Sequence, residues 1–330
     1  MTEFDLIARY FTRPSPRAAL GVGDDCALMD ASPGTQLAIS SDMLVEGRHF
    51  FADVSPRALG HKALAVNLSD LAACGASPRA FTLALALPSI NEAWLQEFSD
   101  GLWSLAEAHD CALIGGDTTQ GPLTICITVF GDVPRGRALL RSSAQVGDDI
   151  YVSGTLGDAR LALEALQGRL DLALPPDRVK EVLAHTRHRL EQPTPRVALG
   201  TALRGIATSA IDISDGLAGD LGHVLKASDV GASVNTDITM TLIAAYNRID
   251  WASATFGTQN RLKTVFSGGD DYELAFTAPG AARDAVVAAA ARSQTPVTRI
   301  GVIERASGLR LVDGHGRPVA GDFTSFDHFA

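Results

Sequence analysis

Aspartate recurs in this chain where apolar sequence gives way to glycine or serine. Five short runs share this pattern, and they are Gly21-Val-Gly-Asp-Asp25, Ala38-Ile-Ser-Ser-Asp42, Asn67-Leu-Ser-Asp70, Ile114-Gly-Gly-Asp117 and Ile211-Asp-Ile-Ser-Asp215. Carboxylates on strand ends and tight turns can converge on hard cations, and Mg²⁺ prefers oxygen ligands, retained waters and bound phosphates to an all-protein cage. The pattern therefore favours a Mg²⁺ site for phosphoryl transfer.

Other common nucleotide and metal motifs are missing from the sequence. It contains no G-x-x-x-x-G-K-[ST] run and no kinase-type glycine loop with its catalytic motifs, which excludes those two nucleotide-binding classes by pattern. The cysteines, Cys26, Cys74, Cys111 and Cys126, form no C-x-x-C pair, which argues against zinc and against a disulfide framework. No convincing Ser-His-Asp or Cys-His arrangement is present, so we expect no covalent intermediate.

Apolar spacing predicts the elements that carry the aspartates in the first half of the chain. We expect helices over 3–11, 56–74 and 92–109, and strands over 37–40, 81–87, 112–114 and 123–133. Asp70 then lies in the last turns of the second helix. Gly115-Gly116 is expected to form a turn in which the backbone can approach a phosphate closely.

The second half predicts another α/β unit. The stretch 134–147 breaks periodicity with Pro, Gly and Arg, so we place the domain boundary there, between residues 1–137 and 146–330. We expect strands over 149–152, 210–213, 272–277, 297–303 and 309–312, and helices over 158–167, 176–190, 195–204 and 281–292. A further helix is expected to begin at Ser214, where hydroxyl and backbone N–H groups can face an anion.

Composition narrows the class of protein. Hydrophobic residues make up 46% and charged residues 20% of the chain, which is typical of a globular protein. A net charge of −10 disfavours nucleic acid and anionic lipid, because both carry the same sign. We find no apolar run of about 18 residues that could span a membrane and no secretory signal. We therefore expect a cytoplasmic protein without nucleic-acid or membrane partners.

The motifs together resemble those of bacterial thiamine-monophosphate kinases, a family in the superfamily of aminoimidazole-ribonucleotide synthetase and selenophosphate synthetase. The matching runs, in the family's order, are Gly-Val-Gly-Asp-Asp25, Ser-Asp42-Met-Leu-Val-Glu-Gly-Arg-His49-Phe, Asn67-Leu-Ser-Asp70-Leu-Ala-Ala, Gly-Gly-Asp117-Thr-Thr, Asp212-Ile-Ser-Asp215-Gly-Leu and Ser-Gly-Gly-Asp270-Asp-Tyr-Glu-Leu. Each run alone is weak, but the ordered set is specific. The resemblance implies ATP-dependent phosphorylation of thiamine monophosphate to thiamine diphosphate, the final step of thiamine diphosphate biosynthesis.

The resemblance also implies roles for individual residues. The implied ligands of several Mg²⁺ ions around the ATP phosphates are Asp25, Ser40, Ser41, Asp42, Asp70, Asp117, Asp212 and Asp215. Among these, Asp42, Asp70 and Asp117 are implied to be catalytic, because their metals align donor and acceptor for direct in-line transfer without a general base. The implied nucleotide contacts are His109, Gly116, Asp117, Arg141 and Ser214, and the implied substrate contacts are His49, Asp270 and Phe326.

Three of these positions depart from the family pattern. His109 stands where the family has a nucleotide-contacting tyrosine. Asp270 stands where Glu is common, which preserves the charge but shortens its reach by one methylene. Phe326 replaces a Trp or Tyr that packs on the thiamine ring, so it keeps the π-face and loses the polar tip.

The resemblance implies an α/β fold of two domains with mixed sheets, like that of aminoimidazole-ribonucleotide synthetase. It further implies that the N-terminal domain of one chain forms a β-barrel with that of a second chain in a homodimer. Two other functions stay open. One is that of a superfamily member that activates an amide or a selenide, although Cys26 lies within the Gly-Asp-Asp run and not in a flexible N-terminal segment. The other is noncatalytic binding of divalent cations.

Overall fold

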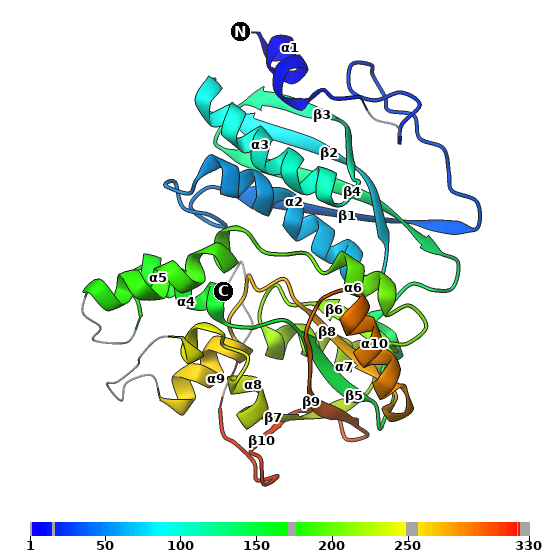
Figure 1. The fold of residues 1–330 in the computed structure, drawn as a ribbon, viewed down its shortest axis with the longest axis vertical. Helices are drawn as coiled ribbons and strands as arrows, with labels where there is room; N and C mark the ends of the chain where they lie inside the picture. Colours follow the sequence, from blue (N-terminus) through cyan, green and yellow to red (C-terminus); the bar gives the residue numbers. More distant parts are fainter. Residues whose placement is uncertain (1, 15–16, 171–175, 249–256, 322, 324–330) are drawn as a thin grey trace. The chain divides into compact units, whose positions relative to one another are not determined.

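The computed structural model of the chain describes residues 2–14, 17–170, 176–248, 257–321 and 323. The chain divides into two compact units (Figure 1). Unit 1 contains residues 1–71 and 76–138, and unit 2 contains residues 72–75 and 139–330.

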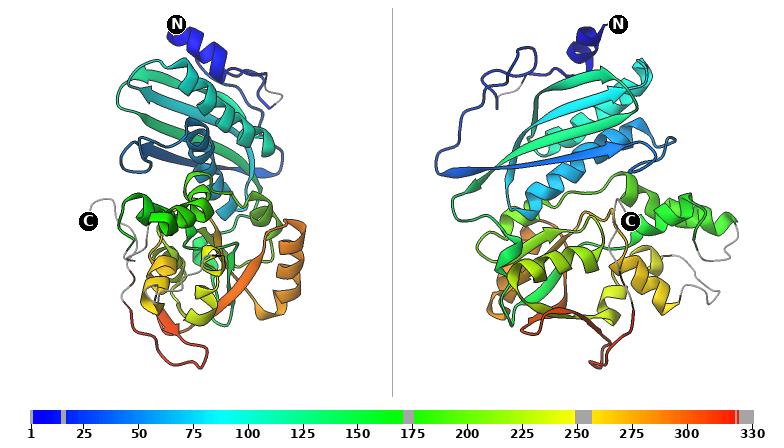
Figure 2. Two further views of the ribbon diagram at one scale, coloured as in Figure 1. Left: turned by 60° about the vertical axis from the view of Figure 1, so that its left-hand side comes forward. Right: turned by 180° about the vertical axis from the view of Figure 1, so that it is seen from behind.

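Unit 1 is built on a four-stranded mixed sheet. Its strands, in spatial order, are β1 (Thr35–Val45), β4 (Thr124–Pro134), β2 (Ser77–Leu87) and β3 (Ala112–Gln120). The β2–β3 pair is parallel and the other two pairs are antiparallel. Helices α2 (Pro56–Ala73) and α3 (Glu92–Ala108) both cover one face of the sheet, and the view from behind shows the opposite face (Figures 1 and 2).

Side-chain alternation gives the two faces of this sheet different characters. Phe81 and Leu83 of β2 are buried, as are Leu68 of α2 and Phe98 of α3, so the helix-covered face is the core of unit 1. The opposite face is more open, and most of the exposed side chains of β1 lie on it. The chain enters unit 1 through α1 (Glu3–Leu6), which Thr2 caps, and a π-helical turn, η1 (Ile7–Phe11).

Unit 2 is built on a six-stranded mixed sheet. Its strands, in spatial order, are β10 (Gly308–Val312), β7 (Gly231–Asn235), β9 (Val297–Glu304), β5 (Asp149–Ser153), β8 (Leu274–Ala278) and β6 (Ser209–Asp212). Only the β10–β7 pair is parallel. The helices are α4 (Asp158–Leu166), α5 (Pro176–Glu191), α6 (Val197–Ala202), α7 (Leu217–Ser228), α8 (Thr236–Met240), α9 (Thr258–Phe266) and α10 (Arg283–Arg292), with short 3₁₀ turns η2 (Arg141–Ser143), η3 (Ala245–Asn247) and η4 (Gly280–Ala282).

The core of unit 2 joins the sheet to its helices. Leu217, Leu221 and Val224 lie on one face of α7 and pack in the same buried cluster as Ile150 of β5 and Ile211 of β6. This is the apolar spacing of a helix that covers a sheet. The helix therefore fixes the end of β6, where the sequence places Asp212 and Asp215.

Most expected elements are confirmed, with three differences. The predicted turn at Gly115-Gly116 is wrong, because both residues lie inside β3. The predicted helix start at Ser214 is also wrong, because α7 begins at Leu217. Strand β7 and helices α8 and α9 were not predicted.

The mixed sheets agree with the expected α/β class. The four-stranded sheet of unit 1 is open among the described residues, with β1 and β3 at its edges, so the dimeric barrel stays a prediction. In the part of the chain that the structure describes, none of the helices is long and apolar enough to cross a membrane.

Paired glycines set the contact between α2 and α3, and they give a stability test. A Cβ on Gly60 would lie 2.0 Å from Phe98 O, and one on Gly101 would lie 1.9 Å from Arg57 O. We predict that Gly60→Ala destabilises the protein, because overpacking costs about 1–3 kcal/mol and outweighs a helix-propensity gain of about 1 kcal/mol. Urea unfolding measures the change.

Gly222→Ala is the matched control. Gly222 also lies inside a helix, but a Cβ there would meet nothing within 4 Å. We expect this variant to be more stable than the unchanged protein by about 0.5–1 kcal/mol. Stabilisation by Gly60→Ala as well would contradict the close approach of the two helices.

Candidate functional site

Three of the predicted site residues of unit 1 meet on the helix-covered face of the sheet. Ser40 Oγ of β1 donates a hydrogen bond of 2.5 Å to Asp70 Oδ2 of α2. Two residues along the same face of β1, the backbone N–H of Asp42 donates to Asn67 Oδ1 at 3.0 Å. Asn67 is buried and its amide donates to Ala63 O at 3.0 Å, so α2 holds β1 at both positions.

Ser41 lies on the opposite face of β1. Side chains alternate along a strand, so a residue between Ser40 and Asp42 must face away from both of them. Its hydroxyl is 2.9 Å from Thr128 Oγ1 and donates to Ile127 O at 3.2 Å, both in the neighbouring strand β4. The structure therefore does not place Ser41 beside Ser40 and Asp42.

Asp25 lies in a surface turn of unit 1. Leu20 and Leu28 pair across this turn, and the backbone N–H of Asp25 donates to Asp24 Oδ1 at 2.8 Å. Asp24 and Asp25 are both exposed. The turn thus presents two adjacent carboxylates to solvent.

Gly116 and Asp117 lie in the edge strand β3. Gly116 has φ 149°, and a Cβ there would lie 1.8 Å from Leu83 O of β2, so only glycine fits this close pairing. The β2–β3 register shifts between Phe81 and Thr82. The close approach of two strands, and not a turn, therefore accounts for this glycine.

Asp42 and Asp117 are at opposite edges of the same sheet. Their strands, β1 and β3, are separated by β4 and β2. Three inter-strand spacings amount to roughly 14 Å, whereas a carboxylate oxygen lies about 2.1 Å from a bound Mg²⁺. One copy of unit 1 therefore does not bring these two carboxylates to a common ion.

The two predicted histidines of unit 1 have distinct environments. His49 Nδ1 accepts a hydrogen bond of 3.0 Å from the Val45 N–H, so a neutral ring carries its proton on Nε2 and can donate from there. His109 caps the C-terminus of α3. Burial, and then the charge of His61, lowers the pKa of His109, which favours its neutral form.

In unit 2, β6 ends at Asp212 and leads into the turn of Ser214 and Asp215. The backbone N–H groups of Ser214 and Asp215 both donate to Asp220 Oδ2 at 3.0 Å. Gly216, with φ 110°, completes the turn before α7 begins. These N–H groups therefore hold Asp220, which was not among the predicted site residues.

Asp220 is buried within α7, and burial raises the pKa of its carboxyl to about 7. The only sequence signal for this residue is an acid in the first turn of a helix that follows a glycine, which is a common arrangement. Its contact with the preceding turn becomes visible only in the structure.

Asp270 lies beside the same turn. Its backbone N–H donates to Ser214 O at 2.8 Å, so two motifs far apart in the sequence meet at the end of β6. Arg141 lies in η2, where its carbonyl oxygen accepts a hydrogen bond of 2.9 Å from Ser228 Oγ of α7. Phe326 lies outside the described residues.

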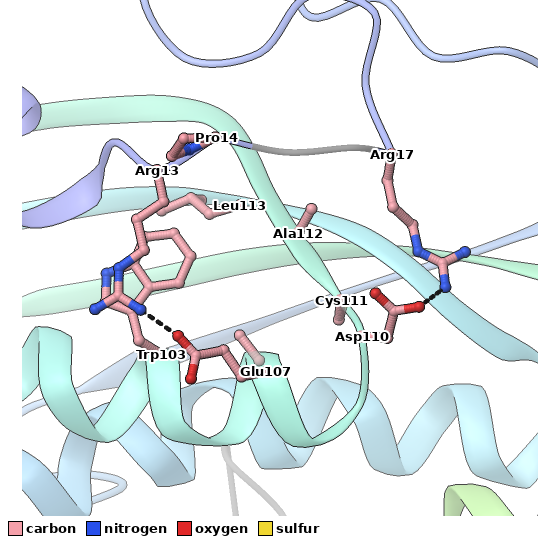
Figure 3. A pocket seen from close by; sticks show the side chains of 10 residues that line it. Arg13, Pro14, Arg17, Trp103, Glu107, Asp110, Cys111, Ala112 and Leu113 are labelled. Carbon is pink, nitrogen blue, oxygen red and sulfur yellow. Dashed lines mark hydrogen bonds and ion pairs between the residues drawn. The ribbon is translucent and has the colours of Figure 1, made fainter.

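A cavity of about 250 Å³ lies between the N-terminal segment of unit 1, helix α3 and the start of β3 (Figure 3). Arg13 pairs with Glu107 there, and Arg17 pairs with Asp110. The Arg13 guanidinium also lies 4.4 Å from the centre of the Trp103 ring. None of the predicted site residues in the described part of the chain lines this cavity, and its charges are balanced.

The predicted metal ligands are all oxygen donors, which fits Mg²⁺ and not a soft cation. Within the described residues, no group of three or more His, Cys, Asp or Glu side chains lies close enough to hold an ion. Mg²⁺ ordinarily keeps several waters and binds through one or two carboxylates together with substrate phosphates. A pair such as Ser40–Asp70 is compatible with that mode of binding.

Comparison with known proteins shows similarity over the whole chain. Residues 23–133 match the model of the AIR synthase related protein N-terminal domain, and residues 145–314 match that of the C-terminal domain. The thiamine-monophosphate kinase of Escherichia coli (strain K12) is 48% identical over 332 residues, which cover 99% of this chain and 98% of that protein.

Solved structures are also similar to this chain over most of its length. The crystal structure of thiamine-monophosphate kinase from Stenotrophomonas maltophilia K279a aligns with a TM-score of 0.80 and 43% identity, and the alignment covers 96% of each chain. The structure of AaThiL complexed with AMPPCP and TMP aligns with a TM-score of 0.74 and 27% identity, over 91% of this chain and 89% of that one.

The hydrogen bonds of Asp220 give a test of how the Ser214–Asp215 turn is held. Asp220→Ala removes the acceptor for two backbone N–H groups, so we predict a loss of about 2 kcal/mol of stability, at about 1 kcal/mol for each hydrogen bond. Asp220→Asn keeps an oxygen in place and should lose much less. Thermal unfolding of both variants checks this, and equal losses would show that the acceptor geometry is unimportant.

Proposed function

The chain belongs to the thiamine-monophosphate kinase family, and on this premise we propose that it transfers the γ-phosphoryl group of ATP to thiamine monophosphate. The products are thiamine diphosphate and ADP. The observation that carries this function is the set of oxygen donors on β1 and α2, where Ser40 bonds Asp70 and Asn67 fixes the backbone of Asp42. Full-length similarity to E. coli thiamine-monophosphate kinase supports the choice of substrates.

The proposed reaction is a direct in-line displacement. A phosphate oxygen of thiamine monophosphate, already ionised, attacks the γ-phosphorus of ATP, while the bond from this phosphorus to the leaving ADP oxygen breaks. No general base is needed, and most of the acceleration comes from positioning and from neutralising charge. The chain's own task is therefore to hold two anions in line.

We propose that several Mg²⁺ ions are held by Asp25, Ser40, Ser41, Asp42, Asp70, Asp117, Asp212 and Asp215. When bound, Mg²⁺ neutralises phosphate charge and so reduces the repulsion between the two substrates. Asn67 would keep Asp42 in place on the strand, and Asp220 would keep Asp215 in place on its turn.

The remaining proposed contacts recognise the two substrates. For ATP they are His109, Gly116, Asp117, Arg141 and Ser214, and the Arg141 guanidinium fork is suited to phosphate oxygens. For thiamine monophosphate they are His49, Asp270 and Phe326. A proton on His49 Nε2 gives that ring a donor for a phosphate oxygen.

We also propose that two copies of the chain assemble along the edge strand β1 of unit 1, which carries Ser40 and Asp42 on its helix-covered face and an apolar row on its open face. Leu37, Ile39 and Met43 of the edge strand β1 are 52%, 59% and 53% exposed on that face. An apolar row of this kind along a sheet edge is typical of an interface. A second copy could also bring its Asp117 to the Asp42 of the first, which one copy alone does not do.

Product analysis with ATP and Mg²⁺ tests the proposed reaction. We expect thiamine diphosphate from thiamine monophosphate, and no product from free thiamine or from formylglycinamidine ribonucleotide. Turnover of the ribonucleotide alone would keep the phosphoryl-transfer site and overturn the substrate. Absence of any turnover would favour a protein that only binds divalent cations.

Mixed dimers test whether Asp42 and Asp117 of one site come from two copies. We predict that Asp42→Asn and Asp117→Asn each lower kcat by about 10³-fold when either variant is expressed alone. Each substitution removes a proposed ligand of the Mg²⁺ ions that neutralise the phosphate charge in the transition state. In random dimers of the two variants, half are mixed and each mixed dimer has one intact site, so about a quarter of the activity should return on co-expression.

Asp100→Asn is the matched control for the single variants. Asp100 lies in α3 of the same unit, where it accepts a hydrogen bond of 3.0 Å from Gln96, and it belongs neither to the proposed ligands nor to the sheet. Loss of this carboxylate should affect stability and leave turnover nearly unchanged. No recovery of activity in the mixed dimers would place Asp42 and Asp117 in a site formed by one chain.

A further inference from the structure

The segment 268–274 of unit 2 has an unusual backbone beside the proposed site. Asp270 has φ 65° and Tyr272 has φ 50°, although neither is glycine. Asp adopts this left-handed conformation more readily than most residues with a Cβ, but for a bulky residue such as Tyr272 it is an outlier that the surrounding structure must hold, and such outliers are concentrated at functional sites. Some other part of unit 2 must therefore fix this segment.

Alternate residues of the segment differ in burial. Asp271 and Glu273 are completely buried, whereas Asp270 and Tyr272 are half-buried. The segment thus has an inner side made of two acids and an outer side that includes the proposed substrate contact. Two carboxylates without solvent need hydrogen-bond donors, since an unpaired buried charge is strongly unfavourable.

Glu273 receives its donors from three parts of unit 2. Arg196 Nε donates to Oε2 at 2.6 Å and its terminal nitrogen donates to Oε1 at 2.5 Å, in a bidentate pair. Arg189 donates to Oε1 at 2.9 Å, and Ser153 Oγ donates to Oε2 at 2.5 Å. The side chain of Arg196 is 17% exposed and that of Arg189 is 9% exposed.

Asp271 and the neighbouring backbone add further contacts, and we call the buried contacts of Asp271 and Glu273 the anchor of this segment. Both carboxylate oxygens of Asp271 accept from the Gly157 N–H, at 3.0 and 2.9 Å, and its carbonyl oxygen accepts from Arg189 at 3.1 Å. A Cβ on Gly154 would lie 2.1 Å from Glu273 Oε1. The side chains of Asp271 and Glu273 are therefore held in place by their hydrogen bonds and by close packing.

The outer side of the segment is fixed to the turn that carries Ser214. The Asp270 N–H donates to Ser214 O and the Tyr272 N–H donates to Ile213 O, both at 2.8 Å. The left-handed residues are the same two residues that make these bonds. A shift of the inner anchor would hence be passed directly to Asp270.

We propose that Arg196 and Glu273 are positioning residues, whose buried ion pair holds the strained backbone at 270–272 so that the Asp270 side chain meets the acceptor substrate. This inference rests on the proposed function, because it assigns Asp270 to thiamine monophosphate. A buried ion pair is weak evidence for stability, since apolar residues of similar volume often stabilise a fold equally well. The strain next to the proposed contact instead indicates a geometric role.

Two variants of Arg196 test the proposal. Arg196→Met keeps the apolar stem and removes the fork, and Arg196→Lys keeps the charge but removes the bidentate geometry. For Arg196→Met we expect the KM for thiamine monophosphate to rise about tenfold, with the KM for ATP changed less than about twofold, because only the acceptor contact is displaced. Arg196→Lys should lie between Met and the unchanged protein.

Hydrogen exchange provides a readout that is independent of activity. In Arg196→Met the amides of Asp270 and Tyr272 should exchange faster, since their hydrogen bonds to the Ser214 turn depend on the anchor. Asp149→Asn is the matched control. Asp149 lies in β5, as Ser153 does, and its buried carboxylate pairs with Arg283 at 2.6 Å and Arg299 at 2.9 Å.

The comparison of Arg196→Met with Asp149→Asn tests whether Arg196 has a positioning role. Asp149→Asn should change stability, but it should change neither KM value nor the exchange of the Asp270 and Tyr272 amides. If Arg196→Met gives the same pattern as Asp149→Asn, the Arg196–Glu273 pair only stabilises the fold and does not position Asp270. An equal rise in both KM values, or unchanged exchange in Arg196→Met, would overturn the positioning role. If the unchanged protein does not phosphorylate thiamine monophosphate, the proposed function fails, and the exchange measurement still decides whether Arg196 holds the segment.

Discussion

Carboxylates that lie close together repel one another, and the structure offsets this repulsion with donors aimed at particular oxygens. Asp70 receives the hydroxyl of Ser40, and Asp220 receives two backbone N–H groups of the turn before α7. Glu273 receives two guanidinium groups. Each donor fixes its acid in one place, so the positions of the acids, and with them the site, depend on these hydrogen bonds.

The acids of unit 2 near the proposed site differ in their burial. In unit 2, Asp220, Asp271 and Glu273 are buried and their hydrogen-bond partners are N–H and O–H groups of the chain. Asp215 and Asp270 adjoin them in sequence or in space and are only half-buried. The acids Asp220, Asp271 and Glu273 therefore hold the backbone of this region, but burial alone does not distinguish them from the proposed ligands, because Asp212 is buried as well.

Sequence patterns were sufficient where the cause of a structure is local. Side-chain alternation and apolar spacing predict most strands and helices, since each depends on residues within a few positions. The missed strand β7, Gly231–Asn235, has only one large apolar residue, Val234, so its alternation is too weak to be recognised. The order of the aspartate motifs likewise indicated the family without any structure.

Features that depend on contacts between residues far apart in the chain could not be predicted from the sequence. Gly116 resembles a turn residue, but the reason for it is the carbonyl oxygen of Leu83 in another strand. The start of α7 moves from Ser214 to Leu217 because Asp220 takes the N–H groups of the preceding turn. Arg196 and Glu273 are separated by 77 positions, and no motif connects them. What could not be predicted is thus the set of contacts that hold the motifs.

The distribution of acids also explains why a chain with a net charge of −10 is suited to anionic substrates. In the proposed reaction, two phosphorylated molecules would be repelled by such a protein unless cations neutralise both sides, so the proposal requires that substrate binding and cation binding are coupled. Asp42 at one edge of a sheet and Asp117 at the other cannot share a cation within one copy of unit 1. A site that uses both must be completed by something beyond that unit, and the same cations that admit the substrates would then stabilise the completed site.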